Sequence, residues 1–156
     1  MLRRKDKVKL AEALQERADL NRKIAELRGR IVNNALVQEG EKPAEEPDEL
    51  IGEMNSALLR LNELIAGINL RNAATTVDGK TLTELIAERD TLTLKVQAYR
   101  ATIDAASRIA QRATRSEIRI VSAVNVKELQ KEADAASKKL RETDLKIQEI
   151  NWLTEY

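Results

Sequence analysis

Four arginines in this chain follow one another at steps of four, three and four residues: Arg108, Arg112, Arg115 and Arg119. On a continuous helix these steps place all four guanidinium groups on one face. Such a face could bind the phosphates of a nucleic acid or another polyanion, because a guanidinium presents a fork of donors to phosphate oxygens. Cations near a helix end also complement the helix dipole and keep the surface soluble. No aromatic side chain accompanies the stripe to stack on bases, so we prefer the structural explanation to nucleic-acid binding.

A second group of polar residues lies on or beside the apolar stripes of the expected helices: Asn69, Asn72, Arg89 and Asn151. A buried arginine requires a carboxylate or amide partner, and Glu88 and Asp90 flank Arg89. We therefore expect a buried polar network that holds helices together. This structural role is preferred over a ligand site.

Several residue types that carry chemistry are missing. The chain has no Cys and no His, so it has no thiolate nucleophile, no disulfide, no zinc cluster and no imidazole base. Carboxylates are frequent, but without a Gly-rich phosphate loop or a serine-elbow motif no pair stands out as acid and base. We predict a protein that is not an enzyme and has no cofactor and no metal site.

Composition favours long helices. Charged residues make up 34% of the chain, Gly (5) and Pro (2) are scarce, and Phe is absent. Apolar residues alternate at steps of three and four over most of the length, which is the spacing of packed helices. The predicted helices cover about residues 4–37, 48–71, 82–114 and 126–153. We expect one mostly α domain over 1–156, an elongated antiparallel four-helix bundle of coiled-coil type.

The connections contain the expected β structure. Residues 39–47, with Gly40, Pro43 and Pro47, predict a solvated linker. Residues 75–82 predict a small β-hairpin, because β-branched residues flank Asp78-Gly79, a pair that tight hairpin turns prefer. Residues 117–122 alternate in polarity and predict one short extra strand.

The ends of an up-and-down bundle would keep these β segments apart, so we expect them to pair between two chains. Ile118 and Ile120 would then belong to an oligomer contact, unless the third helix bends or is shorter than predicted and all three strands pair within one chain. A further apolar stripe off the main seam, made of Leu145, Trp152 and Tyr156, is another candidate for the oligomer contact. It could equally pack against the first helix.

Three blocks of the chain together resemble the septicolysin-like family of small bacterial proteins. They are Asn62–Ile65 with Ile68, Asn69 and Asn72; Asp78–Asp90; and Ile147, Gln148, Asn151 and Trp152. The resemblance implies a helical fold over nearly the whole chain. The family label implies a toxin or haemolysin, whereas the residues themselves supply no spanning segment, since no run of about 18 apolar residues occurs.

We expect a non-enzymatic, self-associating helical protein of the bacterial cytoplasm that acts through its helix surfaces. Net charge is only +1, so no overall field attracts nucleic acid or an anionic membrane. The first alternative function is binding of nucleic acid or another polyanion through the arginine stripe. The second is membrane activity of the septicolysin type. The sequence does not indicate a small-molecule ligand.

Overall fold

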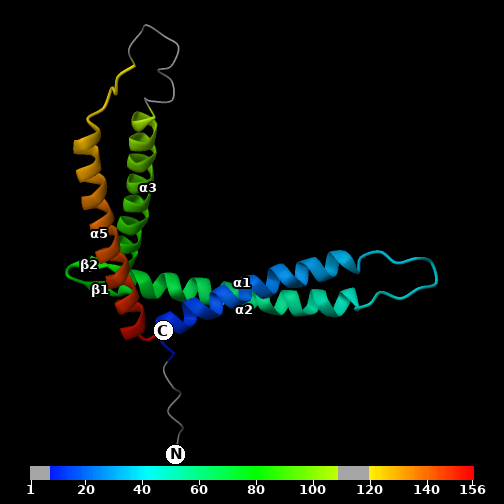
Figure 1. Cartoon of the computed structure of the whole chain (residues 1–156). Coiled ribbons are helices and arrows are strands. Elements are labelled where there is room, and N and C mark those ends of the chain that lie inside the picture. Colours follow the sequence, from blue (N-terminus) through cyan, green and yellow to red (C-terminus); the bar gives the residue numbers. More distant parts are fainter. Residues whose placement is uncertain (1–7, 109–119) are drawn as a thin grey trace, which may run out of the picture. The chain divides into compact units, whose positions relative to one another are not determined.

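The computed structural model describes residues 8–108 and 120–156 (Figure 1). Within them lie four α-helices, α1 (Leu10–Asn33), α2 (Pro47–Ala74), α3 (Leu82–Ser107) and α5 (Val126–Leu153). Two short strands, β1 (Thr76–Val77) and β2 (Lys80–Thr81), form one antiparallel sheet. The prediction of a mostly α chain with four long helices and a small β-hairpin is confirmed.

The chain divides into two compact units. The first unit holds the chain up to Thr76 together with Ile150–Tyr156. The second unit comprises Val77–Glu149.

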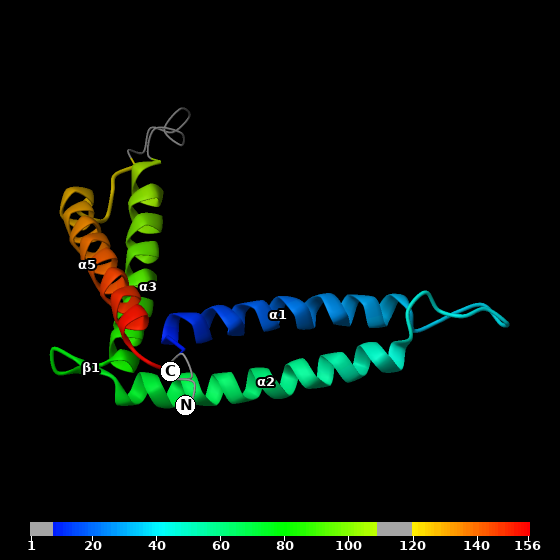
Figure 2. The ribbon, with the colours of Figure 1, turned by 90° about the horizontal axis from the view of Figure 1, so that it is seen from below.

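The first unit is built on α1 and α2, which lie side by side and run antiparallel (Figure 2). Residues at alternating steps of four and three line the facing sides of both helices, as the spacing predicts. The buried apolar residues on these two helices are Leu10, Ala13, Leu27, Leu50, Ala57, Leu64 and Ile68. Short side chains such as alanine allow the two helices to pack closely.

Helix α1 ends four residues before the predicted residue 37, and Asn34 provides the physical reason. Its backbone N–H donates to the carbonyl of Arg30 at 3.1 Å, and its side-chain amide donates to the same carbonyl at 2.9 Å. The Asn34 amide oxygen also accepts from the backbone N–H of Glu45 at 3.1 Å. These bonds cap the helix and hold the linker against it. The helix begins at Leu10 rather than near residue 4.

The last residues of the chain pair with the segment before α1, within the same unit. The backbone N–H of Tyr156 donates to the carbonyl of Val8 at 2.8 Å, and that of Leu10 donates to Thr154 at 2.9 Å. Lys9 and Glu155 thereby form an isolated antiparallel bridge. This bridge was not predicted, because its partners lie at opposite ends of the sequence.

In the second unit, α3 and α5 lie side by side and antiparallel (Figure 1). Buried residues on the two helices include Leu85, Val96, Ala133 and Ala136. The hydroxyl of Tyr99 donates to a carboxylate oxygen of Glu132 at 3.0 Å. This bond links the C-terminal half of α3 to the N-terminal half of α5.

The hairpin turn has the predicted chemistry. Asp78 and Gly79 both have positive φ, 51° and 78°, which is the conformation of a type I′ turn. Thr81 then caps α3: its hydroxyl accepts from the N–H of Glu84 at 3.2 Å, and the Glu84 carboxylate accepts from the N–H of Thr81 at 2.6 Å.

The predicted strand 117–122 is only partly within the described residues. Ile120, Val121 and Ser122 are not in a strand, and residues 117–119 lie outside the described ranges. The predicted last turns of the third helix, 109–114, also lie outside them.

Candidate functional site

Along one edge of the α1–α2 pair, three residues of α1 spaced seven apart form ion pairs with residues of α2 or of the linker. Glu16 forms a bidentate pair with Arg60, with Oε1 to Nε at 2.7 Å and Oε2 to Nη2 at 2.8 Å. Lys23 lies 3.6 Å from Glu53. Arg30 binds Glu45 through Nε, with 3.0 Å to Oε2. Along this edge, each of these three charged residues of α1 thus has a partner of opposite charge.

The pKa values of these groups follow from the pairing. The hydrogen bond from Arg60 lowers the pKa of the Glu16 carboxyl below its usual range, although partial burial opposes this. Arg30 lowers the pKa of Glu45 in the same way. Both carboxylates are therefore more firmly ionised than free glutamate.

The outward side of α2 is different, because it carries no charged residue over nine positions. Three rows of residues spaced seven apart lie next to one another on the helix surface. We call them together the uncharged α2 face: Ile51, Leu58 and Ile65; Asn55, Asn62 and Asn69; Gly52, Leu59 and Ala66. All nine are exposed.

This face stands out against the rest of the molecule. Charged residues make up 34% of the chain, yet the face has none, and it exposes Ile51 by 37%, Leu58 by 42%, Ile65 by 41% and Leu59 by 65%. Depletion of charge around contiguous apolar side chains is a property of the centres of protein interfaces. The uncharged α2 face thus has the residue composition that is typical of an interaction surface.

The second unit contains a cluster of lysines and carboxylates beside the hairpin. Glu88 accepts hydrogen bonds from Lys139 at 2.5 Å and Lys80 at 2.6 Å, and Lys146 pairs with Asp78. The bonds from Lys139 and then Lys80 lower the pKa of the Glu88 carboxyl to about 2. The cluster borders a pocket of about 300 Å³.

This cluster is close to neutral, because three lysines share the pocket wall with three carboxylates, those of Asp78, Glu88 and Glu142. Two of the lysines are bound to Glu88 itself. Such an arrangement stabilises the contact between the hairpin, α3 and α5. It does not present free cations to a polyanion.

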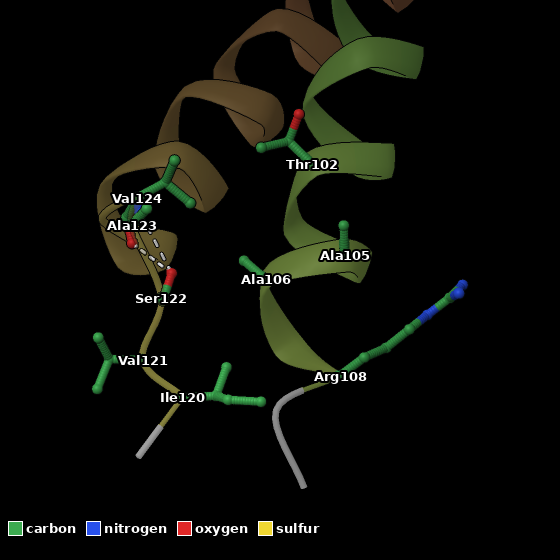
Figure 3. A pocket seen from close by; sticks show the side chains of 9 residues that line it. All are labelled: Thr102, Ala105, Ala106, Arg108, Ile120, Val121, Ser122, Ala123 and Val124. Atoms are coloured by element: carbon green, nitrogen blue, oxygen red, sulfur yellow. Dashed lines mark hydrogen bonds between the residues drawn. The ribbon is translucent and has the colours of Figure 1, made fainter. Parts of the chain in front are cut away.

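A second pocket, of about 390 Å³, lies between the end of α3 and residues 120–124 (Figure 3). Small or apolar side chains line most of it, among them Ala105, Ala106, Ile120 and Val124. The Arg108 side chain extends away from Ile120 in this view (Figure 3). Among the described residues, the wall of this pocket is mostly apolar, and its one cation, Arg108, extends away from Ile120.

Only part of the predicted arginine stripe can be placed. Arg108 is exposed just after the end of α3. Arg112, Arg115 and Arg119 lie outside the described residues. The stripe stays a prediction.

The four polar residues predicted as a buried network are placed at the surface or half-buried. Asn69 is exposed, Asn72 and Asn151 are half-buried, and the Arg89 side chain is 34% exposed. Arg89 binds the neighbouring Asp90 through Nε at 3.0 Å and approaches Asp144 at 4.0 Å. None of the four is fully buried, and the network stays a prediction. Arg89 places its guanidinium among surface carboxylates instead of in its seam.

The residues predicted for the oligomer contact are mostly exposed. Leu145 is 66% and Trp152 64% exposed, and Ile120 is 41% exposed. Ile118 lies outside the described residues. Tyr156 is half-buried, because its ring lies against Gly67 of α2.

Sequence reasoning missed the uncharged α2 face, although its signal was present. The apolar stripe that predicts α2 runs through Leu50, Met54 and Ile68, and it assigns Leu58 and Ile65 to the packed side, whereas both are exposed. The signal is a spacing of seven residues within two neighbouring rows, one of asparagines and one of Ile51, Leu58 and Ile65.

Two kinds of site are not found in the described part of the chain. No group of three or more acidic residues there is arranged to hold a metal ion. None of the helices in the ranges 8–108 and 120–156 combines the length and hydropathy that crossing a membrane requires.

Fold and surface together define a mostly α protein built on antiparallel helix pairs, with an uncharged face on one helix. The model of a protein family described as a family of unknown function (DUF6847) matches residues 17–156, and the chain belongs to this family. No curated protein matches the chain.

A solved structure supports the fold. It is described as the crystal structure of a functionally unknown conserved protein from Corynebacterium diphtheriae. It is 39% identical, has a TM-score of 0.90, and the match covers 95% of this chain and 97% of that one. Neither description mentions a septicolysin, so that resemblance stays a prediction.

Proposed function

We propose that this chain is a non-enzymatic, self-associating helical protein of the bacterial cytoplasm that acts through its helix surfaces. The observation that carries the proposal is the uncharged α2 face, which exposes five apolar side chains among its nine positions and has no charged residue at any of them. Water-exposed leucine and isoleucine in a continuous row gain free energy when another surface covers them.

The ion-paired edge of the same helix pair supports the choice of this face for the contact. There, Arg60, Glu16 and their neighbours are already paired with each other. Bringing a partner against that edge would remove paired charges from water, which costs free energy. A partner on the nine positions of the uncharged α2 face meets apolar and amide groups, and the one carboxylate in line with them, Asp48, lies seven residues before Asn55 at the end of the middle row.

The ionisable groups favour a structural role over acid–base catalysis. Each of the described carboxyls whose pKa is shifted has it lowered: Glu16, Glu45, Glu84 and Glu88. A catalytic acid working near neutral pH needs a raised pKa instead. In these residues charge serves helix capping and helix pairing.

Size-exclusion chromatography with light scattering tests the proposal on the full chain. At micromolar concentration we expect a mass of at least twice the 17.5 kDa of one chain. A mass of one chain across the soluble range would contradict the proposal. Dissociation on dilution, without loss of helical circular dichroism, would support association between folded chains.

A further inference from the structure

We infer that the partner on the uncharged α2 face is a second copy of this chain, with the two α2 helices packed antiparallel about a two-fold axis close to Leu58 and Leu59. The inference rests on the proposed function and deepens it, because it names the occupant and the register. It rests on the order of residues along the face: when the same face of a second copy runs in the opposite direction, residues of matching type lie opposite each other.

A two-fold axis across an antiparallel helix pair places residues equally far from the axis opposite each other. In the first row, Ile51 then faces Ile65 of the second copy, and Leu58 faces Leu58. All contacts in this row are between large apolar side chains. Their exposed fractions, 37–42%, leave surface that such a contact would cover.

The middle row matches under the same axis. Asn55 faces Asn62 of the second copy, so two amide pairs form, one on each side of the axis. A primary amide can donate and accept at once, so opposed asparagines satisfy each other. Seven residues further out, about two turns, Asp48 faces Asn69, which places a carboxylate opposite an amide donor.

The third row explains a glycine that the chain itself does not need. Gly52 lies inside α2 with φ in the ordinary range, and a Cβ there would meet nothing within 4 Å. Glycine weakens a helix compared with alanine, so packing within the chain offers no reason for it. The axis places Gly52 opposite Ala66 of the second copy, where two small residues allow the helices to approach closely.

Cysteine cross-linking tests the register directly, because the natural chain has no cysteine. A mixture of Asn55→Cys and Asn62→Cys chains should form a disulfide-linked pair under mild oxidation. Either variant alone should link poorly, because its cysteines would lie about seven residues apart along the helix, or about 10 Å, beyond the usual disulfide range of about 7 Å between Cα atoms. Leu94→Cys, at an exposed position of α3, is the control that measures how much disulfide forms by random collision.

Charge substitution gives an independent test on the same positions. A chain with Asn55→Lys and Asn62→Lys should lose association at least tenfold, as should a chain with Asn55→Glu and Asn62→Glu. Mixing the two should restore a mixed pair, because opposite charges then face each other. Circular dichroism confirms that each variant folds.

The outcomes separate the inference from the proposed function. A wild-type chain that stays monomeric overturns both. A wild-type oligomer in which the mixed cysteines link no better than Leu94→Cys overturns the register while self-association stands. Selective linkage of the mixed pair supports both.

Discussion

The hydroxyl of Tyr156 lies so close to Gly67 on α2 that a Cβ at this glycine would overlap it. The backbone of Tyr156 is held at the same time by its hydrogen bond to Val8. Within the first unit, Tyr156 thus packs its ring on α2 at Gly67, where the missing Cβ leaves space for the ring. Gly67 is present for close contact, unlike Gly29, whose surroundings are open.

Gly67→Ala should lower the free energy of unfolding by about 1 kcal/mol, because the ring must shift and the extra methyl is forced into a filled space. Urea unfolding measures the change. Gly29→Ala is the matched control and should stabilise by about 0.5–1 kcal/mol, since alanine is the better helix former. In a Tyr156→Ala background Gly67→Ala should no longer destabilise; an equal loss there would show that Tyr156 is not the cause.

The Glu16–Arg60 pair should contribute little to the free energy of unfolding, although its two hydrogen bonds have good geometry. Both side chains are more than 40% exposed. A double-mutant cycle with Glu16→Gln and Arg60→Gln should therefore give a coupling of about 0.2–1 kcal/mol, which falls as salt is added. A coupling that does not respond to salt would contradict a solvent-exposed ion pair.

Glu88 should make stability depend on acid pH. Its carboxyl has a pKa of about 2 in the folded chain, against an ordinary value of 4.5, because Lys139 and Lys80 hydrogen-bond to it. A lowered folded pKa stabilises the fold above the ordinary value, and this contribution is lost as the pH falls from 4.5 towards 2. The decline in unfolding free energy over that window should be shallower in Glu88→Gln. Identical declines in the two proteins would show that the lysines do not hold this carboxylate.

Local features of the fold could be predicted because their causes lie within a few residues. The Asp78-Gly79 turn follows from the residues that accept positive φ. The capping box of Thr81 and Glu84 follows from side chains three residues apart. The cap of the last helix is similar, with the Asn125 side chain accepting from the N–H of Glu128 at 3.2 Å.

Features that depend on distant residues could not be predicted from spacing. The end of α1 requires Asn34 to meet Glu45 across the linker. The bridge between Lys9 and Glu155 joins the two ends of the chain. Arg89 was predicted as buried because it lies on the apolar stripe, but a long side chain can leave the stripe and place its charge at the surface, as it does here beside Asp90.

The central claim is that the uncharged α2 face holds two chains together, and a matched pair of leucines tests it most directly. Leu59 on this face and Leu145 on α5 are 65% and 66% exposed, and each has a glutamate four residues later, Glu63 and Glu149. Sedimentation velocity should show that Leu59→Lys is monomeric, whereas Leu145→Lys associates as the wild type does. Association that survives Leu59→Lys and is lost in Leu145→Lys would contradict the claim and place the contact on α5.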